Sequence, residues 1–479
     1  MTNRAPIPLL LALLSLLAAC ASVRPKPSEP PVLRIELQHA APDRFVARIH
    51  TDAVRELRFE RPTAGRGGWR VRGPGGPLPL LRDGAQDVLR APSPQGRLGR
   101  LDIELPIDER PPEKDYRSFL RFSQGGVLVY TGQLAAAVDG ASLRRRVTLT
   151  PLPGERIVGR GQVHDGPWVL DDPEDGTYVC FCTVEPIADE HVLAVVDAGM
   201  WPETAQTARS LLPPLFAFYE RRLGAKLPWR PTIFISGRTE GRGRSLDMGG
   251  GTLDGLIQLH LGLGPALSPS DPTVAHGFEG LIAHEAAHLW AGQVFHHDVP
   301  KGDWMHEGAA DVLAWRALVE LGAWPREVLA GRAARAASIC LQGGSSGALT
   351  EARVKVWYAC GATLMLAAEA SARARDPRAD VLSLWRAVFG RARHGAYSLD
   401  DVYAGFVEAG AEAGLVEAIR ARVEGRPGAA GWEALLLRAG LAPTVQAGPP
   451  EEMNGVRRDA CGGPDRCPEA RWVVLEGLR

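Results

Sequence analysis

Two histidines and one glutamate in this chain have the spacing of groups that share one metal ion. The string HEAAH carries His284, Glu285 and His288, and eighteen residues then separate His288 from Glu307. If the string is helical, the histidines at i and i+4 lie on one face and can hold a single zinc ion. Glu307 would supply a third, oxygen ligand and leave a fourth position open for water, which separates a catalytic zinc from a structural one.

Amide hydrolysis is the chemistry that this arrangement predicts. A zinc ion held by His284, His288 and Glu307 would lower the pKa of its bound water to near neutrality. Glu285 would act as general base and take the proton while that water attacks a carbonyl carbon. Asp311 follows Glu307 by four residues, so on a helix it would face the same way and could accept the free N–H of a ligating histidine. An ordinary solvated aspartate is the alternative at that position.

The run from His284 to Asp311 resembles the zinc-site region of the aminopeptidase N family of gluzincin metallopeptidases. It keeps the family's tryptophan two residues after the second histidine (Trp290), the glycine that follows (Gly292), and the W-x-x-E-G pattern around Glu307. The resemblance implies the same three zinc ligands and the same general base as the spacing does. It also implies an N-terminal β-sheet domain and a thermolysin-like catalytic domain.

A tyrosine downstream is the candidate for stabilising the oxyanion. The pattern Y-x-x-G from Tyr358 to Gly361 is similar to the family's Y-x-K-G, whose tyrosine hydroxyl steadies the tetrahedral intermediate. Cys360 stands where the family usually has lysine, and the distance along the chain from Glu307 is somewhat short. A half-buried helix tyrosine without a catalytic role is the alternative.

The segment upstream of HEAAH departs from the family. There the family has G-x-M-E-N, whose glutamate grips the amino terminus of the substrate, whereas GGGTLDGLI in this chain places Thr252 opposite that glutamate. Asp254 lies two residues further along and is either a substitute anchor or a turn residue before glycine. Gly250 and Gly251 would let a substrate backbone approach and pair as an added strand. Amide hydrolysis is therefore better supported than amino-terminal exopeptidase action.

The amino terminus has the features of a bacterial lipoprotein. Residues 1–19 combine a short cationic start with an apolar run that is too short to span a bilayer as a stable helix, and Leu-Ala-Ala-Cys ends at Cys20. Cleavage would leave Cys20 lipidated, followed by a proline-rich tether at residues 20–31. We expect a cell-envelope protein anchored by lipid, in the outer membrane and facing the periplasm or the surface. An uncleaved anchor or a plain secretory peptide is the alternative.

Six further cysteines would meet an environment that permits disulfides. Cys461 and Cys467 bracket a Gly-Gly-Pro turn and form the favoured bridge, and Cys340 with Cys360 is a second candidate. A second metal site is disfavoured because the sequence has no C-x-x-C pair. Spacing alone does not assign the other two: Cys180 and Cys182.

Composition excludes some functions. The net charge is -1, from 55 basic and 56 acidic residues, and the only basic tract is Arg144 to Arg146. This balance gives no electrostatic footprint for nucleic acid, and we expect the three arginines to lie on a solvated strand edge.

His296, His297 and His306 lie close to the motif in the sequence, but the matching family positions are not ligands, so we expect loop residues there.

These elements together predict an α+β multidomain chain. Short strand-favouring runs separated by Gly and Pro turns indicate a β-rich domain at 32–197. The thermolysin-like catalytic domain is expected at 198–330, and an Ala-, Leu- and Arg-rich helical region at 331–442 would complete the active site. Residues 443–479 form a Cys-containing tail.

We expect a lipid-anchored zinc peptidase that acts on peptides and binds no nucleic acid. A peptide-binding lipoprotein of the same fold with an inactive metal site is the main rival, and the departures at Thr252 and Cys360 favour it. A zinc hydrolase for a non-peptide substrate is the third possibility, because the family also includes leukotriene hydrolase-like enzymes. Fold-level analogy does not choose among them.

Overall fold

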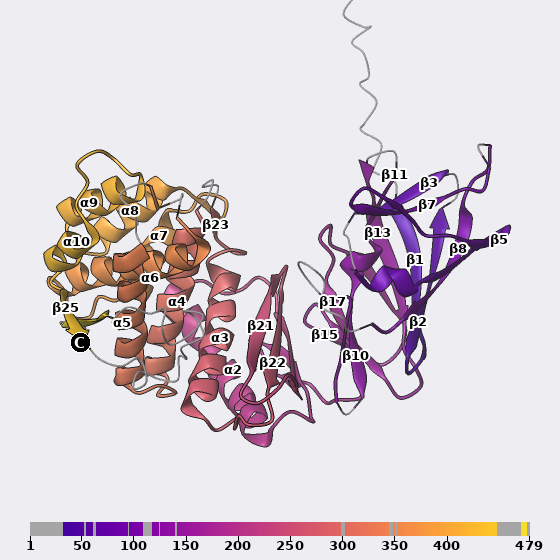
Figure 1. Ribbon diagram of the computed structural model, residues 1–479, viewed down its shortest axis with the longest axis horizontal. Coiled ribbons are helices and arrows are strands. Elements are labelled where there is room, and N and C mark those ends of the chain that lie inside the picture. Colours follow the sequence, from indigo (N-terminus) through magenta and orange to yellow (C-terminus); the bar gives the residue numbers. More distant parts are fainter. Residues whose placement is uncertain are drawn as a thin grey trace, which may run out of the picture.

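The computed structural model describes residues 32–447 and 471–476, except for 52–53, 61–63, 94, 109–116, 124, 139–140, 298–301, 344–347 and 350–351. Its architecture is α+β, as expected: strands dominate as far as β19 (Leu193–Val196) and helices dominate after it. Figure 1 shows the strand-rich part at one end of the molecule and the helices at the other, with β21 (Leu246–Leu253) and β22 (Leu256–Leu263) between them.

Three sheets make up the N-terminal part. The largest has the order β16 (Trp168–Asp172), β13 (Arg144–Thr150), β1 (Val32–Ala41), β2 (Arg44–Thr51), β8 (Gly99–Pro106), β4 (Arg70–Gly73) and β5 (Gly76–Leu78). The second has the order β15 (Gln162–His164), β14 (Arg156–Gly159), β17 (Tyr178–Cys182), β10 (Gly126–Tyr130) and β9 (Phe119–Arg121). The third has the order β12 (Ala141–Ser142), β11 (Ala136–Val138), β3 (Glu56–Phe59), β7 (Gln86–Arg90) and β6 (Leu81–Asp83).

Strict alternation of apolar and polar residues explains the long strands of the first sheet. Along β1 the side chains of Leu33, Ile35 and Leu37 are buried, and those between them are exposed. This period of two places all the apolar residues on one face of the sheet. That face shares one apolar core with Val179 and Phe181 of β17, so the core of the N-terminal part lies between the sheets.

The tract Arg144 to Arg146 is solvated at Arg144 and Arg146, as we expected, but Arg145 is buried and the strand is not at an edge. β13 is paired on both sides, parallel to β1 and antiparallel to β16. Arg145 is buried, and its Nε donates a hydrogen bond to Asp172 Oδ2 at 2.7 Å while its Nη2 donates to two backbone carbonyls. A buried guanidinium needs such hydrogen-bond acceptors to compensate its charge. The sequence pattern did not show that these acceptors lie next to Arg145.

The other face of the β17 sheet joins the N-terminal part to the rest of the chain. Cys180 and Cys182, the cysteines that spacing left unassigned, are buried free thiols on this face. They belong to an apolar cluster that also contains Leu193 and Phe234 of the following sheet. Burial raises the pKa of the Cys180 thiol well above its usual value, so this residue is neutral and acts as a small apolar side chain.

The fourth sheet lies next to the helix that contains HEAAH. Its order is β18 (Ile187–Ala188), β19, β20 (Thr232–Thr239), β22 and β21. β19, β20 and β22 are parallel, whereas β21 pairs antiparallel with β22 at the end of the sheet. Helix α2 (Pro202–Leu223) is the crossover between β19 and β20. The sheet therefore takes two strands from before residue 198, where we expected the catalytic domain to begin.

Helices form most of the remaining structure. They are α3 (Pro272–Trp290), α4 (Asp303–Glu320), α5 (Arg326–Gly343), α6 (Val354–Arg373), α7 (Val381–Arg391), α8 (Leu399–Glu408), α9 (Ala413–Val423) and α10 (Trp432–Arg438). Two short strand pairs accompany them: β23 (His296–His297) with β24 (Ala396–Tyr397), and β25 (Ala442–Ala447) with β26 (Arg471–Glu476). None of the described helices has both the length and the apolar character that a bilayer span requires.

One of the two candidate disulfides is present. Cys340 of α5 and Cys360 of α6 are bonded and join two helices that pack side by side. Cys20, Cys461 and Cys467 lie outside the described residues, so their predicted lipidation and pairing stay predictions. The strand pairing of β25 with β26 in the tail was not expected from its Pro- and Gly-rich sequence.

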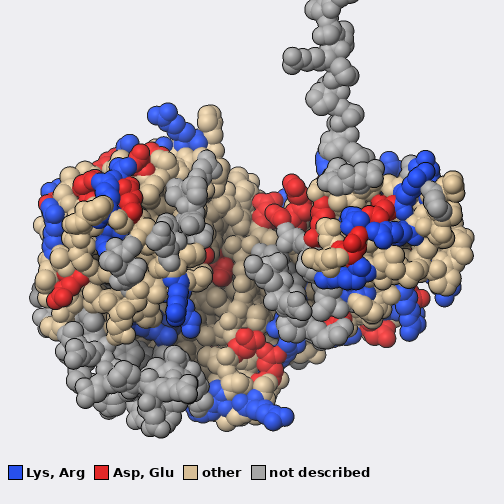
Figure 2. Space-filling view, turned by 45° about the horizontal axis from the view of Figure 1, so that its top comes forward, with Lys and Arg blue, Asp and Glu red and all other residues tan. Residues whose placement is uncertain are grey.

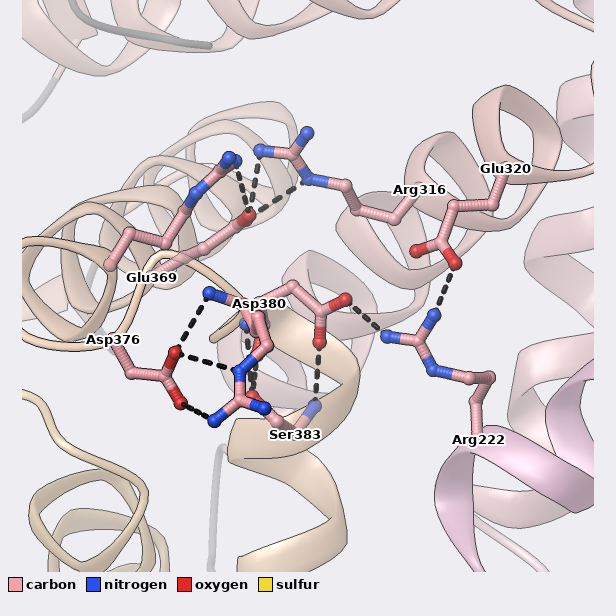
Figure 3. Close-up of polar contacts among 9 residues, drawn as sticks. Arg222, Arg316, Glu320, Glu369, Asp376, Asp380 and Ser383 are labelled. Atoms are coloured by element: carbon pink, nitrogen blue, oxygen red, sulfur yellow. Dashed lines mark hydrogen bonds and ion pairs between the residues drawn. The ribbon is translucent and has the colours of Figure 1, made fainter.

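A polar network ties the helices together on the side shown in Figure 3. Arg316 of α4 pairs with the buried Glu369 of α6, with 2.6 Å between Nη2 and Oε1. Arg222 of α2 donates to Glu320 of α4 and to Asp380, the residue that caps α7. Four helices are therefore joined by charge-assisted hydrogen bonds, which are stronger than neutral ones.

Candidate metal centre

The three predicted ligands converge on one point. His284 Nε2 lies 3.0 Å from His288 Nε2 and 3.1 Å from Glu307 Oε2, and His288 Nε2 lies 3.2 Å from the same oxygen. Tetrahedral zinc with ligands at 2.0–2.1 Å separates them by about 3.3 Å, so the triangle has the right size. Among the described residues, no other cluster of histidine, cysteine and carboxylate side chains has the geometry to hold a metal ion.

Helix α3 presents the two histidines. It begins after Asp271, whose side chain accepts a hydrogen bond from Thr273 N at 2.9 Å, with Pro272 in the first turn. Both features favour a helix start, because they satisfy or remove backbone N–H groups that have no partner within the helix. The helix is buried over most of its last two turns, and His284 and His288 project from one face with ring centroids 4.7 Å apart.

Helix α4 brings the third ligand and its neighbour. Glu307 and Asp311 lie one turn apart, and Asp311 Oδ1 is 2.9 Å from His284 Nδ1. With a proton on Nδ1, His284 donates to Asp311 and turns the lone pair of Nε2 toward the other two ligands. Asp311 is therefore in the place that the spacing predicted, rather than an ordinary solvated aspartate.

The charges around the site favour a cation. Burial works against a charge on His284, but hydrogen bonds to Asp311 and Glu307 prevail and raise the pKa of His284 to about 10. Burial opposes the ionisation of Glu307, but its hydrogen bonds to His284 and His288 outweigh this and hold the pKa of Glu307 well below its usual value. Two imidazole nitrogens and one carboxylate oxygen are a donor set that zinc prefers, and the negative charge of the carboxylates favours a cation there.

Glu285 and Tyr358 border the cluster without belonging to it. Glu285 is half-buried, and within the described ranges nothing donates a hydrogen bond to its carboxylate. The ring of Tyr358, on α6, lies 6.3 Å from that of His284 and nearly parallel to it. Burial raises the pKa of Tyr358, as does the negative charge of Glu307, so the hydroxyl keeps its proton. The site is therefore bordered by one carboxylate and one protonated hydroxyl.

Two glycines let the helices that carry Glu307 and Tyr358 touch. A Cβ on Gly308 of α4 would lie 2.3 Å from the backbone carbon of Gly361 in α6. A Cβ on Gly361 would lie 1.8 Å from the carbonyl oxygen of Trp304. The backbones therefore cross in direct contact one residue after Glu307 and three residues after Tyr358, which brings the tyrosine to the ligand.

Replacing Gly361 with alanine should therefore destabilise the protein and loosen the metal site. We expect a loss of about 1–3 kcal/mol in the free energy of unfolding, because overpacking must push α4 from α6. Urea unfolding with zinc titration measures both effects. Gly390→Ala is the matched control, since a Cβ at that position in α7 meets no atom within 4 Å. Equal stability of the two variants would contradict the close crossing.

Three neighbouring histidines have roles that differ from our expectation of loop residues. His306 belongs to α4 and its ring stacks on that of His288, with centroids 4.1 Å apart. Burial, together with the charge of His288, lowers the pKa of His306 to about 3. His306 is therefore neutral, and its ring packs against the imidazole of His288. His296 and His297 form β23, which pairs with β24. In the sequence, only the position of His306 directly before Glu307 indicated that its ring could pack near the candidate ligands.

The predicted substrate-binding segment is β21, at the end of its sheet. Gly250, Gly251 and Thr252 lie within the strand, and Asp254 lies in the turn that follows it. Asp254 makes an ion pair with Arg160 at 3.2 Å and lies in the turn before Gly255. Figure 2 shows the surface hollowed between the strand-rich part and the helices, with an acidic side chain visible inside the hollow.

Comparisons with known proteins bear on the fold. No protein-family profile matches the sequence, and no curated protein matches it. The structure is similar to the crystal structure of the aminopeptidase N family protein from Idiomarina loihiensis, with a TM-score of 0.62 and 15% identity. The match covers 87% of this chain and 79% of that one. The chain thus has the fold of an aminopeptidase N family protein, and its His284, His288 and Glu307 cluster is consistent with the gluzincins of that family.

Proposed function

We propose that the protein is a zinc-dependent peptidase that hydrolyses peptide bonds. The observation that carries this proposal is the triangle of His284, His288 and Glu307 donor atoms, with edges of 3.0–3.2 Å, near the half-buried carboxylate of Glu285. A structural zinc site is closed by four protein ligands, whereas this cluster has three. Zinc bound there would polarise a carbonyl group and make water more acidic.

The surrounding residues divide the remaining work. Glu285 accepts the proton of the attacking water and returns it to the leaving amine. Tyr358, whose hydroxyl is protonated, donates a hydrogen bond to the developing oxyanion. Asp311 holds His284 in one tautomer and orientation. The free edge of β21 offers backbone groups with which an extended substrate pairs as an added strand.

The amino terminus of the substrate has no anchor of the expected kind. Thr252 stands where the aminopeptidases have a glutamate, and Asp254 is engaged by Arg160 in a turn. A free ammonium group would therefore gain little at this end of the strand. We propose that cleavage does not depend on a free amino terminus.

A peptide panel tests the proposal. Matched peptides with free and acetylated amino termini are incubated with the purified protein, products are identified by mass spectrometry, and bound zinc is measured on the same sample. We expect one zinc per chain and cleavage that is indifferent to acetylation. Stoichiometric zinc without cleavage of any peptide would reject the peptidase and favour the inactive peptide-binding lipoprotein.

Changing Tyr358 to phenylalanine should lower kcat while leaving zinc binding intact. The loss of one oxyanion donor costs on the order of 10²-fold to 10³-fold in kcat. The ring and its stacking with His284 would remain, so the fold should be unaffected. Unchanged turnover would show that Tyr358 is only a half-buried helix residue.

We also propose that Cys20 anchors the protein by lipid in the bacterial cell envelope, at the outer membrane. The support is the cationic start, apolar run and Leu-Ala-Ala-Cys ending of residues 1–20. Metabolic labelling with a fatty acid should mark the natural chain but not a Cys20→Ala variant. Label on the variant would reject this site.

A further inference from the structure

Two arginines of α5 are half-buried and have no acidic partner. Arg332 and Arg335 lie one turn apart, and within the described part of the chain no carboxylate lies within ion-pair distance of either. Burial lowers the pKa of both, and the charge of Arg335 adds to this effect on Arg332. A buried guanidinium is costly unless an anion compensates it, so this pair is suited to bind an anion from outside the chain.

Arg332 lies close to the first metal ligand. Its guanidinium carbon is 5.6 Å from the centre of the Trp324 ring, which in turn is 5.9 Å from the ring of His276 on α3. Trp324 also packs against Gly280, one turn before His284 on the same helix. Asp311, which contacts His284, carries a negative charge that works to raise the pKa of Arg332. Arg332 therefore lies near the N-terminal half of α3, with Trp324 between them.

The edge strand β21 begins near the N-terminal half of α3, the end at which Trp324 and Arg332 lie. At its end, the carbonyl oxygen of Leu253 accepts a hydrogen bond from Gln293 Nε2 at 2.6 Å, just beyond the C-terminus of α3. At its beginning, Met248 packs against Gly277, next to His276. The strand thus runs in the same direction as α3, and a peptide paired with it has one end near Gln293 and the other near His276.

We propose that Arg332, assisted by Arg335, binds a carboxylate of the substrate on the carboxyl-terminal side of the scissile bond. This rests on the proposed peptidase function and names the substrate class of the same site. A guanidinium offers two parallel N–H groups that match a carboxylate and repels an ammonium group. The arginines therefore direct the carboxyl end of the peptide toward His276, which makes the bound peptide antiparallel to β21.

The acidic residues nearby already have partners. Glu279 accepts a hydrogen bond from Trp324 Nε1 at 2.8 Å. Asp247, at the beginning of β21, lies 3.4 Å from His260 Nε2 and 3.9 Å from an Arg117 nitrogen. Neither pairs with Arg332. Neither of these carboxylates neutralises the arginines, so we infer a preference for short peptides with a carboxylate at this end.

Binding measurements separate this inference from the catalytic proposal. The zinc-loaded Glu285→Gln protein is titrated calorimetrically with the tripeptide Ala-Leu-Ala as free acid and as amide, and with Ala-Leu-Glu amide. We expect the acid to bind about tenfold or more tightly than its amide. Tight binding of Ala-Leu-Glu amide would show that a side-chain carboxylate is recognised. Weak binding of this peptide would show that the α-carboxylate is recognised instead. Equal affinity of acid and amide, or no binding of any peptide at millimolar concentration, would overturn the inference.

A variant assigns the effect to the arginine. In Arg332→Met, made in the same Glu285→Gln background, the acid-to-amide ratio should fall to about one, within twofold. Arg326→Met is the matched control, because Arg326 is an exposed arginine of the same helix that lines a different cavity. An unchanged ratio in a folded Arg332→Met protein would overturn the inference. If the unaltered protein cleaves no peptide while the ratio still depends on Arg332, the peptidase proposal fails and the carboxylate site stands.

Discussion

Replacement of Glu285 with glutamine should lower the rate of peptide hydrolysis by roughly 10²-fold to 10⁴-fold, the range that a general base contributes. Glutamine keeps the shape of the side chain but accepts no proton at neutral pH. Zinc content should stay at one per chain, because Glu285 is not among the three residues whose donor atoms converge. Initial rates on a cleaved peptide and zinc analysis of the same sample measure both quantities.

The control for this variant is Glu203→Gln, at an exposed position in the first turn of α2. It makes the same chemical change far along the chain from the metal cluster and should leave the rate unchanged. Retained turnover in Glu285→Gln would remove Glu285 from the mechanism. Loss of zinc in that variant would instead make the residue part of the metal site.

Replacement of Glu307 with alanine should weaken zinc binding by more than about 100-fold and abolish hydrolysis with it. Loss of second-layer partners alone typically costs 10- to 100-fold in metal affinity, so loss of a ligand should cost more. The variant also leaves His284 and His288 without the carboxylate that both contact at 3.1–3.2 Å. Competition with a chelator of known affinity gives the change in zinc affinity.

Excess zinc should restore part of the activity of this variant if the two histidines still hold the ion. Glu327→Ala, at an exposed position of α5, is the control and should bind zinc like the unaltered protein. Zinc affinity that is the same in Glu307→Ala and in the unaltered chain would refute the three-ligand site.

Parts of the candidate metal centre could be predicted because they depend on residues one helical turn apart. His284 and His288 are four residues apart on one helix, so the geometry of α3 alone places them together. Asp311 is likewise placed by its distance of one helical turn from Glu307. The apolar residues of 203–223 and 381–391 also recur with helical spacing, which predicts helices there, and α2 and α7 match these ranges within one residue.

Other features depend on partners that are distant in the sequence. The tract at Arg144 to Arg146 looked solvated because its acceptor, Asp172, lies 27 residues beyond Arg145. β19 joins the sheet next to the metal site because α2 returns the chain to pair β20 beside it. Side-chain periodicity specifies which face of a strand is buried, but not which strand lies next to it.

The sequence by itself predicted the α+β class from its strand and helix patterns, and it predicted the three residues that could hold a metal ion from helical spacing and the family resemblance. Only the tertiary structure decided that Gly308 and Gly361 let α4 and α6 touch, and that Arg332 has no ion-pair partner among the described residues. The physical reason is that packing between helices depends on which surfaces meet, and a residue's neighbours in space are not encoded by its neighbours in the chain.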